Sequence, residues 1–73
     1  MNNDFEYMKE ALATELTELL INEYKISIPE ALDILYFSDT YKKLCDKQTG
    51  LYFQSSLYIY SYLKNEITLG VIG

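Results

Sequence analysis

Hydrophobic side chains recur at intervals of three and four residues along the first third of the chain. This interval matches the period of an α-helix, so these side chains share one face of the helix. Acidic residues close to Asn3 and Asp4 suit the positive end of the helix dipole. The pattern therefore predicts a helix over about 4–24. Its apolar stripe consists of Phe5, Met8, Leu12, Leu16, Leu19 and Leu20.

The four residues from Ser27 to Glu30 carry a signal for the start of a second helix. Their spacing is that of a capping box, in which the serine and glutamate side chains each bind a free backbone N–H group of the other residue. Pro29 fits the first turn because its missing N–H group would have no partner there. We expect a helix from Ile28 to residue 37. Its apolar face would consist of Ala31, Leu32, Leu35 and Tyr36.

A third, short helix is predicted over about 39–46. The apolar pattern breaks after Phe37, and Ser38 or Asp39 is a residue type that caps helices. The inward residues of this helix would be Tyr41, Leu44 and Cys45, with Lys42 and Lys43 facing water. A turn should follow from Asp46 to Gly50, because Asp, Gln, Thr and Gly cluster there.

The segment from Leu57 to Leu63 can be interpreted in two ways. It is rich in tyrosine and partly alternating, which is typical of a strand. A helix is favoured because Ser55 or Ser56 would cap it and because Lys64, Asn65 and Glu66 extend it; we place it over about 55–67. In that helix Ile59 and Leu63 would be core residues, and Tyr58 and Tyr62 would lie on a flank.

These elements predict an all-α fold, a compact bundle of three to four short helices, in a single domain over 1–73. An irregular apolar C-terminal tail, Thr68 to Gly73, is expected as a strand-like end laid over the bundle. A tail that becomes ordered on a partner is the alternative.

Charge is distributed unevenly along the chain. The net charge is −5, and most of the acidic residues precede Tyr36. Lysines are scattered and arginine is absent, so the basic stripe of an ordinary nucleic-acid binder is missing, and we expect no direct binding to DNA or RNA. The single Cys45 and the acidic start of the chain favour a cytoplasmic protein, and no apolar run approaches the roughly 20 residues that span a membrane.

The residue types give little support to catalysis. Without histidine, a serine or cysteine nucleophile lacks its usual base and the commonest metal ligand is missing. Cys45 is therefore interpreted as a small hydrophobic residue on a helix face. The acidic pairs on the first helix are interpreted as solvated, Asp33 as a carboxylate satisfied by cap or tyrosine hydrogen bonds, and no phosphate loop occurs. We expect no enzyme, no cofactor and no metal.

Two short stretches resemble a known group of proteins. They read A-L-D-x-x-Y-x-S-x-x-Y from Ala31 and T-G-L-Y-x-Q-S from Thr49. From Glu15 onward the chain resembles short, uncharacterised bacterial proteins of similar length. The resemblance implies a small all-helical fold with no assigned activity, and some distantly similar short families look like partners of toxin domains. No functional residue is transferred from it.

Surplus tyrosine suggests a function. Aromatic rings supply much of the energy of protein interfaces, and a chain of 73 residues has little interior in which to bury eight tyrosines. The leading hypothesis is a protein-interaction module that binds itself or another protein through its last helix. The alternative is an acidic, antitoxin-like inhibitor that occupies a basic site of a toxin or nucleic-acid-handling partner. The candidate partner-binding residues are Tyr52, Tyr58, Tyr60, Tyr62, Glu6, Glu10 and Glu18.

Overall fold

The computed structural model describes residues 4–70 of the chain, and within them it contains helices and no strand. The predicted all-α fold class is confirmed. The elements are α1 (Asp4–Tyr24), α2 (Ile28–Phe37), α3 (Asp39–Cys45), η1 (Lys47–Thr49), η2 (Leu51–Phe53) and α4 (Ser56–Leu69), where η marks a single turn of 3-10 helix.

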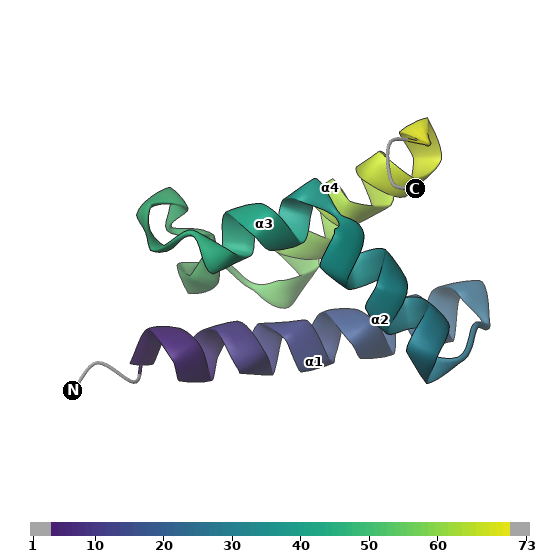
Figure 1. Cartoon of the computed structure of the whole chain (residues 1–73), viewed down its shortest axis with the longest axis horizontal. Coiled ribbons are helices and arrows are strands. Elements are labelled where there is room, and N and C mark those ends of the chain that lie inside the picture. Colours follow the sequence, from purple (N-terminus) through teal and green to yellow (C-terminus); the bar gives the residue numbers. More distant parts are fainter. Residues whose placement is uncertain (1–3, 71–73) are drawn as a thin grey trace.

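The long helix α1 forms one side of the molecule and the three shorter helices form the other (Figure 1). Helix α1 packs against both α2 and α4, while α3 packs against α2 and α4. The short turn η2 also contacts α1, so the segment between α3 and α4 lies beside the N-terminal half of α1 (Figure 1).

Local capping explains where α2 and α4 begin. The Ser27 hydroxyl accepts a hydrogen bond from the Glu30 backbone N–H, and the Glu30 carboxylate accepts one from the Ser27 N–H at 2.9 Å. The predicted capping box is thus confirmed. At α4, the Ser55 hydroxyl accepts a hydrogen bond from the Tyr58 N–H at 3.2 Å. Each cap satisfies a backbone donor that the first turn of a helix leaves free.

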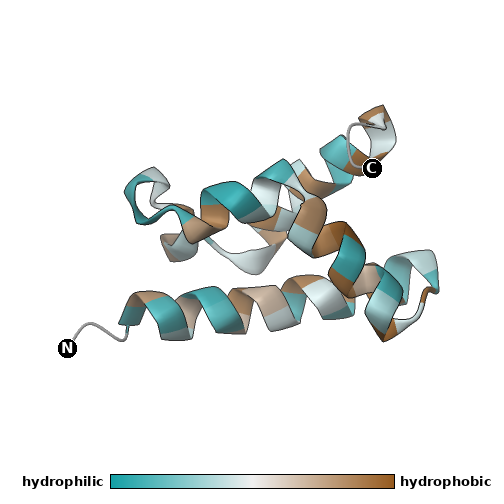
Figure 2. Ribbon diagram, viewed as in Figure 1, coloured by the Kyte–Doolittle hydropathy of each residue, from teal (hydrophilic) through white to brown (hydrophobic). Residues whose placement is uncertain are grey.

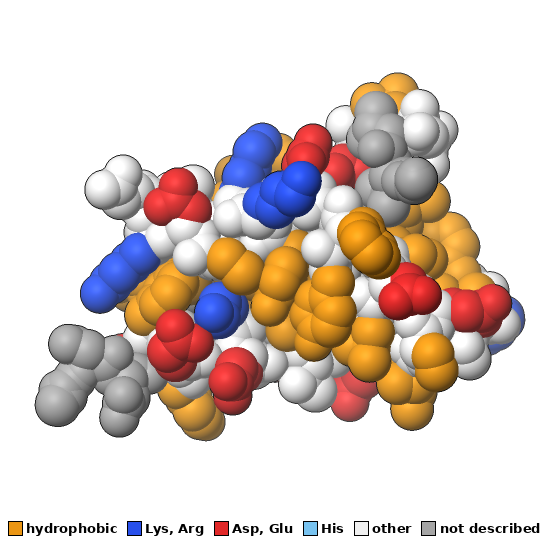
Figure 3. Space-filling model, viewed as in Figure 1, with side chains coloured by type: hydrophobic (Ala, Val, Ile, Leu, Met, Phe, Trp, Pro, Cys, Tyr) orange, Lys and Arg blue, Asp and Glu red, His pale blue; other side chains and the backbone are white. Residues whose placement is uncertain are grey.

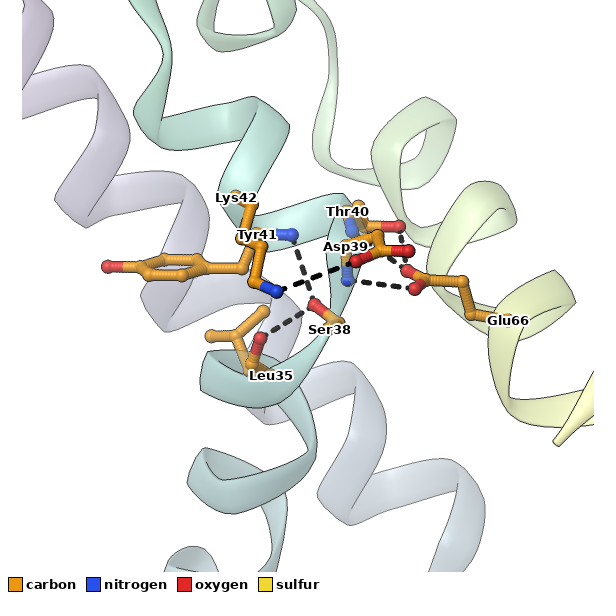
Figure 4. Close-up of polar contacts among 7 residues, drawn as sticks. All are labelled: Leu35, Ser38, Asp39, Thr40, Tyr41, Lys42 and Glu66. Carbon is orange, nitrogen blue, oxygen red and sulfur yellow. Dashed lines mark hydrogen bonds and ion pairs between the residues drawn. The ribbon is translucent and has the colours of Figure 1, made fainter. Parts of the chain in front are cut away.

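Helices α2 and α3 meet at one residue, Ser38, without a loop between them. The Ser38 hydroxyl donates a hydrogen bond to the Leu35 carbonyl at 2.6 Å and accepts one from the Tyr41 N–H at 3.0 Å. Glu66 of α4 completes the junction (Figure 4): its carboxylate accepts hydrogen bonds from the N–H groups of Asp39 and Thr40, both at 2.8 Å, and from the Thr40 hydroxyl. A residue of α4 therefore caps α3.

A single hydrophobic core lies between α1 and the shorter helices. Hydrophobic bands recur along α1 between hydrophilic ones (Figure 2), and the four-residue spacing of Leu12, Leu16 and Leu20 places them on one buried face. Within residues 4–70, every buried side-chain nitrogen or oxygen has a hydrogen-bond partner. The buried hydrophobic residues are Leu12, Leu16, Leu20, Ala31, Leu35, Leu44, Tyr52, Ile59, Tyr60 and Leu63.

The predicted bounds of α1 and α2 are confirmed, while the later ones shift. Helix α3 ends at Cys45, and η1 replaces the predicted simple turn. The tail prediction was wrong for Thr68 and Leu69, which continue α4 until Gly70 ends it with a φ of 74°. Glycine adopts this left-handed conformation without the steric cost other residues bear. Residues 71–73 of the predicted tail lie outside the described part.

Cys45 is also a correction, because its side chain is exposed. Thr40 and Leu44, four residues apart, form the buried row of α3. The residue after Leu44 is turned by about 100° around the helix axis and so points to solvent. Tyr41 is half-buried, and Lys42 and Lys43 face water as predicted.

Candidate functional site

Helix α4 presents two faces of different character. On the inner face, Ile59 and Leu63 are completely buried, as the sequence predicted. On the neighbouring outer face, Tyr58 and Tyr62 are 46% and 47% exposed, which confirms their predicted place on a flank. The core is closed by the inner face, so these two rings remain available on the surface.

The outer tyrosines form a pair. Their hydroxyl oxygens lie 3.0 Å apart, and their rings meet edge to face with centroids 5.3 Å apart. The hydrogen bond to Tyr62 raises the pKa of Tyr58. Residues four apart on a helix are neighbours, and here each ring restricts the rotation of the other. A pair already held in one arrangement loses less conformational entropy when a partner covers it.

A depression lies beside this pair, between α3 and α4. It has a volume of about 320 Å³, and Tyr62 and Leu51 supply its apolar lining. Lys43 and Asn65 add polar groups, and the Glu66 carboxylate there is already engaged in capping α3. The depression is large enough to receive one or two side chains of another molecule.

Tyr60 was predicted as a partner-binding residue, and its burial contradicts that role. Only 6% of Tyr60 is exposed, and its hydroxyl donates a hydrogen bond to the Glu23 carboxylate at 2.9 Å. The ammonium group of Lys64 pairs with the same carboxylate at 3.0 Å. Burial, followed by the contact with Glu23, raises the pKa of Tyr60, and the contacts with Lys64 and then Tyr60 lower the pKa of Glu23. Tyr60 thus fastens α4 to the end of α1.

Tyr52 was also predicted as a partner-binding residue, and its burial contradicts that role as well. Its ring is buried and meets Phe5 of α1 edge to face, with centroids 4.8 Å apart. The adjacent Phe53 was not predicted as a site residue. Its ring centroid lies 4.2 Å from that of Tyr52, and it is 68% exposed. Which of these two adjacent rings is buried depends on Phe5 of α1, so the local sequence carries no signal to separate them.

The three predicted acidic residues are exposed on α1, but they are not brought together with the outer tyrosines. Glu6 pairs with Lys9 at 3.1 Å, and this contact raises the pKa of Lys9. Glu10 and Glu18 line a different feature, a groove between α1 and α2 that contains no residue of α4. The tyrosines in that groove are Tyr36 and Tyr41, whose ring centroids are 5.0 Å apart.

The groove tyrosines were missed as site residues, although the repeat of four residues from Ile28 through Leu32 to Tyr36 signals a stripe on α2. Burial, followed by the contact with Cys45, raises the pKa of Tyr41 to about 12. Asp33, considered above as a satisfied carboxylate, is instead exposed.

Residues 4–70 hold no group of three or more acidic, cysteine or histidine side chains arranged to bind a metal ion. Over the same residues, none of the helices combines the length and apolarity needed to cross a membrane. No protein-family model, curated protein or solved structure matches the chain. The surfaces described above are therefore the basis for a functional argument.

Proposed function

We propose that this chain is a non-enzymatic protein-interaction module that binds a second protein chain, either another copy or a different protein, through the outer face of α4. The observation that carries the proposal is the paired exposure of Tyr58 and Tyr62 beside a core that is complete without them. Tyrosine is enriched among residues that dominate binding energy, because its ring buries a large area while its hydroxyl keeps a polar partner. The depression next to Tyr62 offers a place for an anchoring side chain.

Substitution of both tyrosines by alanine tests this proposal. We expect association to weaken by at least roughly 1 kcal/mol for each ring, the scale of a contributing interface residue. The fold should persist, since both side chains lie outside the core. Light scattering after size exclusion measures self-association, and thermal melts measure folding.

A photo-crosslinking residue at position 62 extends the test to a different partner. In the matched control, the photo-crosslinking residue replaces Tyr7, which is 75% exposed on α1. Crosslinking to one partner from position 62 and not from position 7 supports the proposal. A chain that remains monomeric and gives the same crosslinks from both positions would contradict it.

A second candidate function is the acidic inhibitor, favoured by the exposure of Glu6, Glu10 and Glu18 on one helix. Such a chain would associate with a basic site quickly, and the rate would fall with added salt. Reversal of all three residues to lysine should abolish binding if this candidate is correct. The same reversal should have little effect on a complex formed through α4.

A further inference from the structure

We infer that the groove between α1 and α2 docks a basic amphipathic helix of a partner protein. This inference concerns a second surface and is independent of the proposed role of α4. The groove has a volume of about 510 Å³. Its apolar lining comes from three helices: Ala13 and Ile21 of α1, Ile28, Leu32 and Tyr36 of α2, and Tyr41 of α3.

Two of the apolar side chains of the groove are open to solvent, and the others are partly buried. Ile28 is 60% exposed and Tyr36 is 50% exposed, and Leu32 lies between them on the same face of α2. Figure 3 shows hydrophobic side chains gathered in the middle of this side of the molecule, where α2 and α3 lie over α1. Together they form an apolar strip that the fold itself does not cover.

The charge around the groove selects the partner. The charged residues that line the groove are Glu10, Glu18 and Lys9. Lys9 is paired with Glu6. Glu10 and Glu18 stand on the α1 edge of the groove and are exposed. An apolar floor beside an acidic edge complements an apolar stripe flanked by lysine or arginine.

The length of the groove selects a helix. Glu10 and Glu18 are eight residues apart, as are Ile28 and Tyr36, so each edge runs for about 12 Å, or about two helical turns. A docked helix would place apolar residues at positions i, i+4 and i+7 on the floor and basic residues about two turns apart against Glu10 and Glu18. Pairing with an extended strand is not available, since residues 4–70 contain no sheet edge.

Another copy of the chain fits this surface poorly. Each copy carries a net charge of −5, so a second copy would bring negative charge to an acidic edge. Like charges brought together at an interface oppose binding. The occupant is therefore a chain of opposite charge.

The test uses two designed peptides of leucine and a charged residue, each about four helical turns long. One carries lysine and the other carries glutamate at the same positions. Each is titrated into the full chain with labelled methyl groups and followed by NMR. We expect the lysine peptide to shift the methyl signals of Ala13, Ile21 and Leu32 in a saturable way at low salt. The methyl groups of Leu57 and Leu69, exposed on α4 and outside the groove, should not shift.

Matched variants separate the groove from general acidity. Glu10→Gln together with Glu18→Gln should raise the Kd for the lysine peptide by about threefold to tenfold, the scale of two exposed ion pairs. Glu15→Gln removes another exposed charge of α1, outside the groove, and should change the Kd by less than about twofold. Tyr36→Ala should abolish saturable binding, and Tyr62→Ala, at a tyrosine of similar exposure on α4, should leave it unchanged. Thermal melts check that each variant folds.

Several outcomes would overturn the inference. These are the absence of saturable shifts, equal binding of the glutamate peptide, shifts that extend to Leu57 and Leu69, or equal effects of Glu15→Gln and the groove pair. Groove signals that change on dilution without peptide would identify a second copy as the occupant instead. Loss of an α4 complex in Tyr62→Ala, with peptide binding retained, would show that the two surfaces act separately.

Discussion

Tyr60 and Tyr62 lie two residues apart in α4, yet they occupy opposite environments. Tyr60 is buried and its hydroxyl is held by Glu23 of α1, whereas Tyr62 is half-exposed and its hydroxyl meets another tyrosine of the same helix. The side chains are chemically identical, so the difference comes from their angle around the helix axis and from what α1 places opposite them. Tyrosine content thus indicates a surface only once the inward face of the helix is known.

The largest expected difference between the two faces of α4 concerns leucine. Leu63→Ala should lower the free energy of unfolding by about 2–5 kcal/mol, because it leaves a cavity among completely buried residues. Leu69→Ala, at a leucine of α4 that is 67% exposed, should change it by less than about 0.5 kcal/mol. Urea denaturation measures both. Equal losses would mean that α4 has no distinct inner face.

A smaller loss of stability is expected when Glu66, near the C-terminal end of α4, is replaced. Glu66→Ala leaves the Asp39 and Thr40 N–H groups without their acceptor and should cost about 1–3 kcal/mol. Asn65→Ala, at the exposed neighbour, is the control and should cost less than about 0.5 kcal/mol. Denaturation gives the free energies, and the NMR shifts of the two amides locate the change. Unchanged amide signals in Glu66→Ala would contradict the cap.

Alkaline pH should lower the free energy of unfolding through Tyr60 on the inner face of α4. The folded-state pKa of Tyr60 is raised above the ordinary value of 10.0, so the fold favours the neutral phenol. Its contribution to stability is complete below pH 10 and is lost as pH rises through the folded-state pKa. The slope approaches about 1.4 kcal/mol per pH unit for each such tyrosine. The free energy of unfolding, measured on both sides of pH 10, should fall more steeply with pH for the native chain than for Tyr60→Phe. Equal slopes would refute a role for the Tyr60 hydroxyl in this pH dependence.

The smallest expected difference in stability is between variants that lose a single tyrosine hydroxyl group at neutral pH. Tyr60→Phe removes the hydrogen bond to Glu23 and should cost about 1 kcal/mol. Tyr62→Phe removes a hydrogen bond between exposed groups and should change stability by less than about 0.5 kcal/mol. Thermal melts of the two variants can be compared directly. A greater loss for Tyr62→Phe would reverse the assignment of inner and outer tyrosines.

Helix starts could be predicted from the sequence because their causes are local. Ser27, Ser38 and Ser55 each cap a helix that begins at the next residue. The capping atoms lie within three residues of their partners, so no knowledge of the tertiary structure was needed.

Side-chain environments that depend on distant elements were harder to predict. Tyr60 is buried against α1, where its hydroxyl lies within hydrogen-bond distance of the Glu23 carboxylate and the Leu19 carbonyl, and Tyr52 is buried with Phe5 against its ring. Neither partner is near in sequence. The groove was hard to predict for the same reason. Glu10 and Tyr36 line one groove only because α2 packs against α1.

The cap that Glu66 places on α3 also makes the folding of that helix depend on α4. Helix α3 has seven residues, and isolated helices shorter than about 12–15 residues are marginal in water. Ser38 supplies a local cap for α3, but the N–H groups of Asp39 and Thr40 find their acceptor on a carboxylate 26 residues after Thr40. In a chain truncated before Glu66, the amide hydrogens of Asp39–Cys45 should therefore exchange faster than in the full chain, because α3 then lacks the acceptor that α4 supplies.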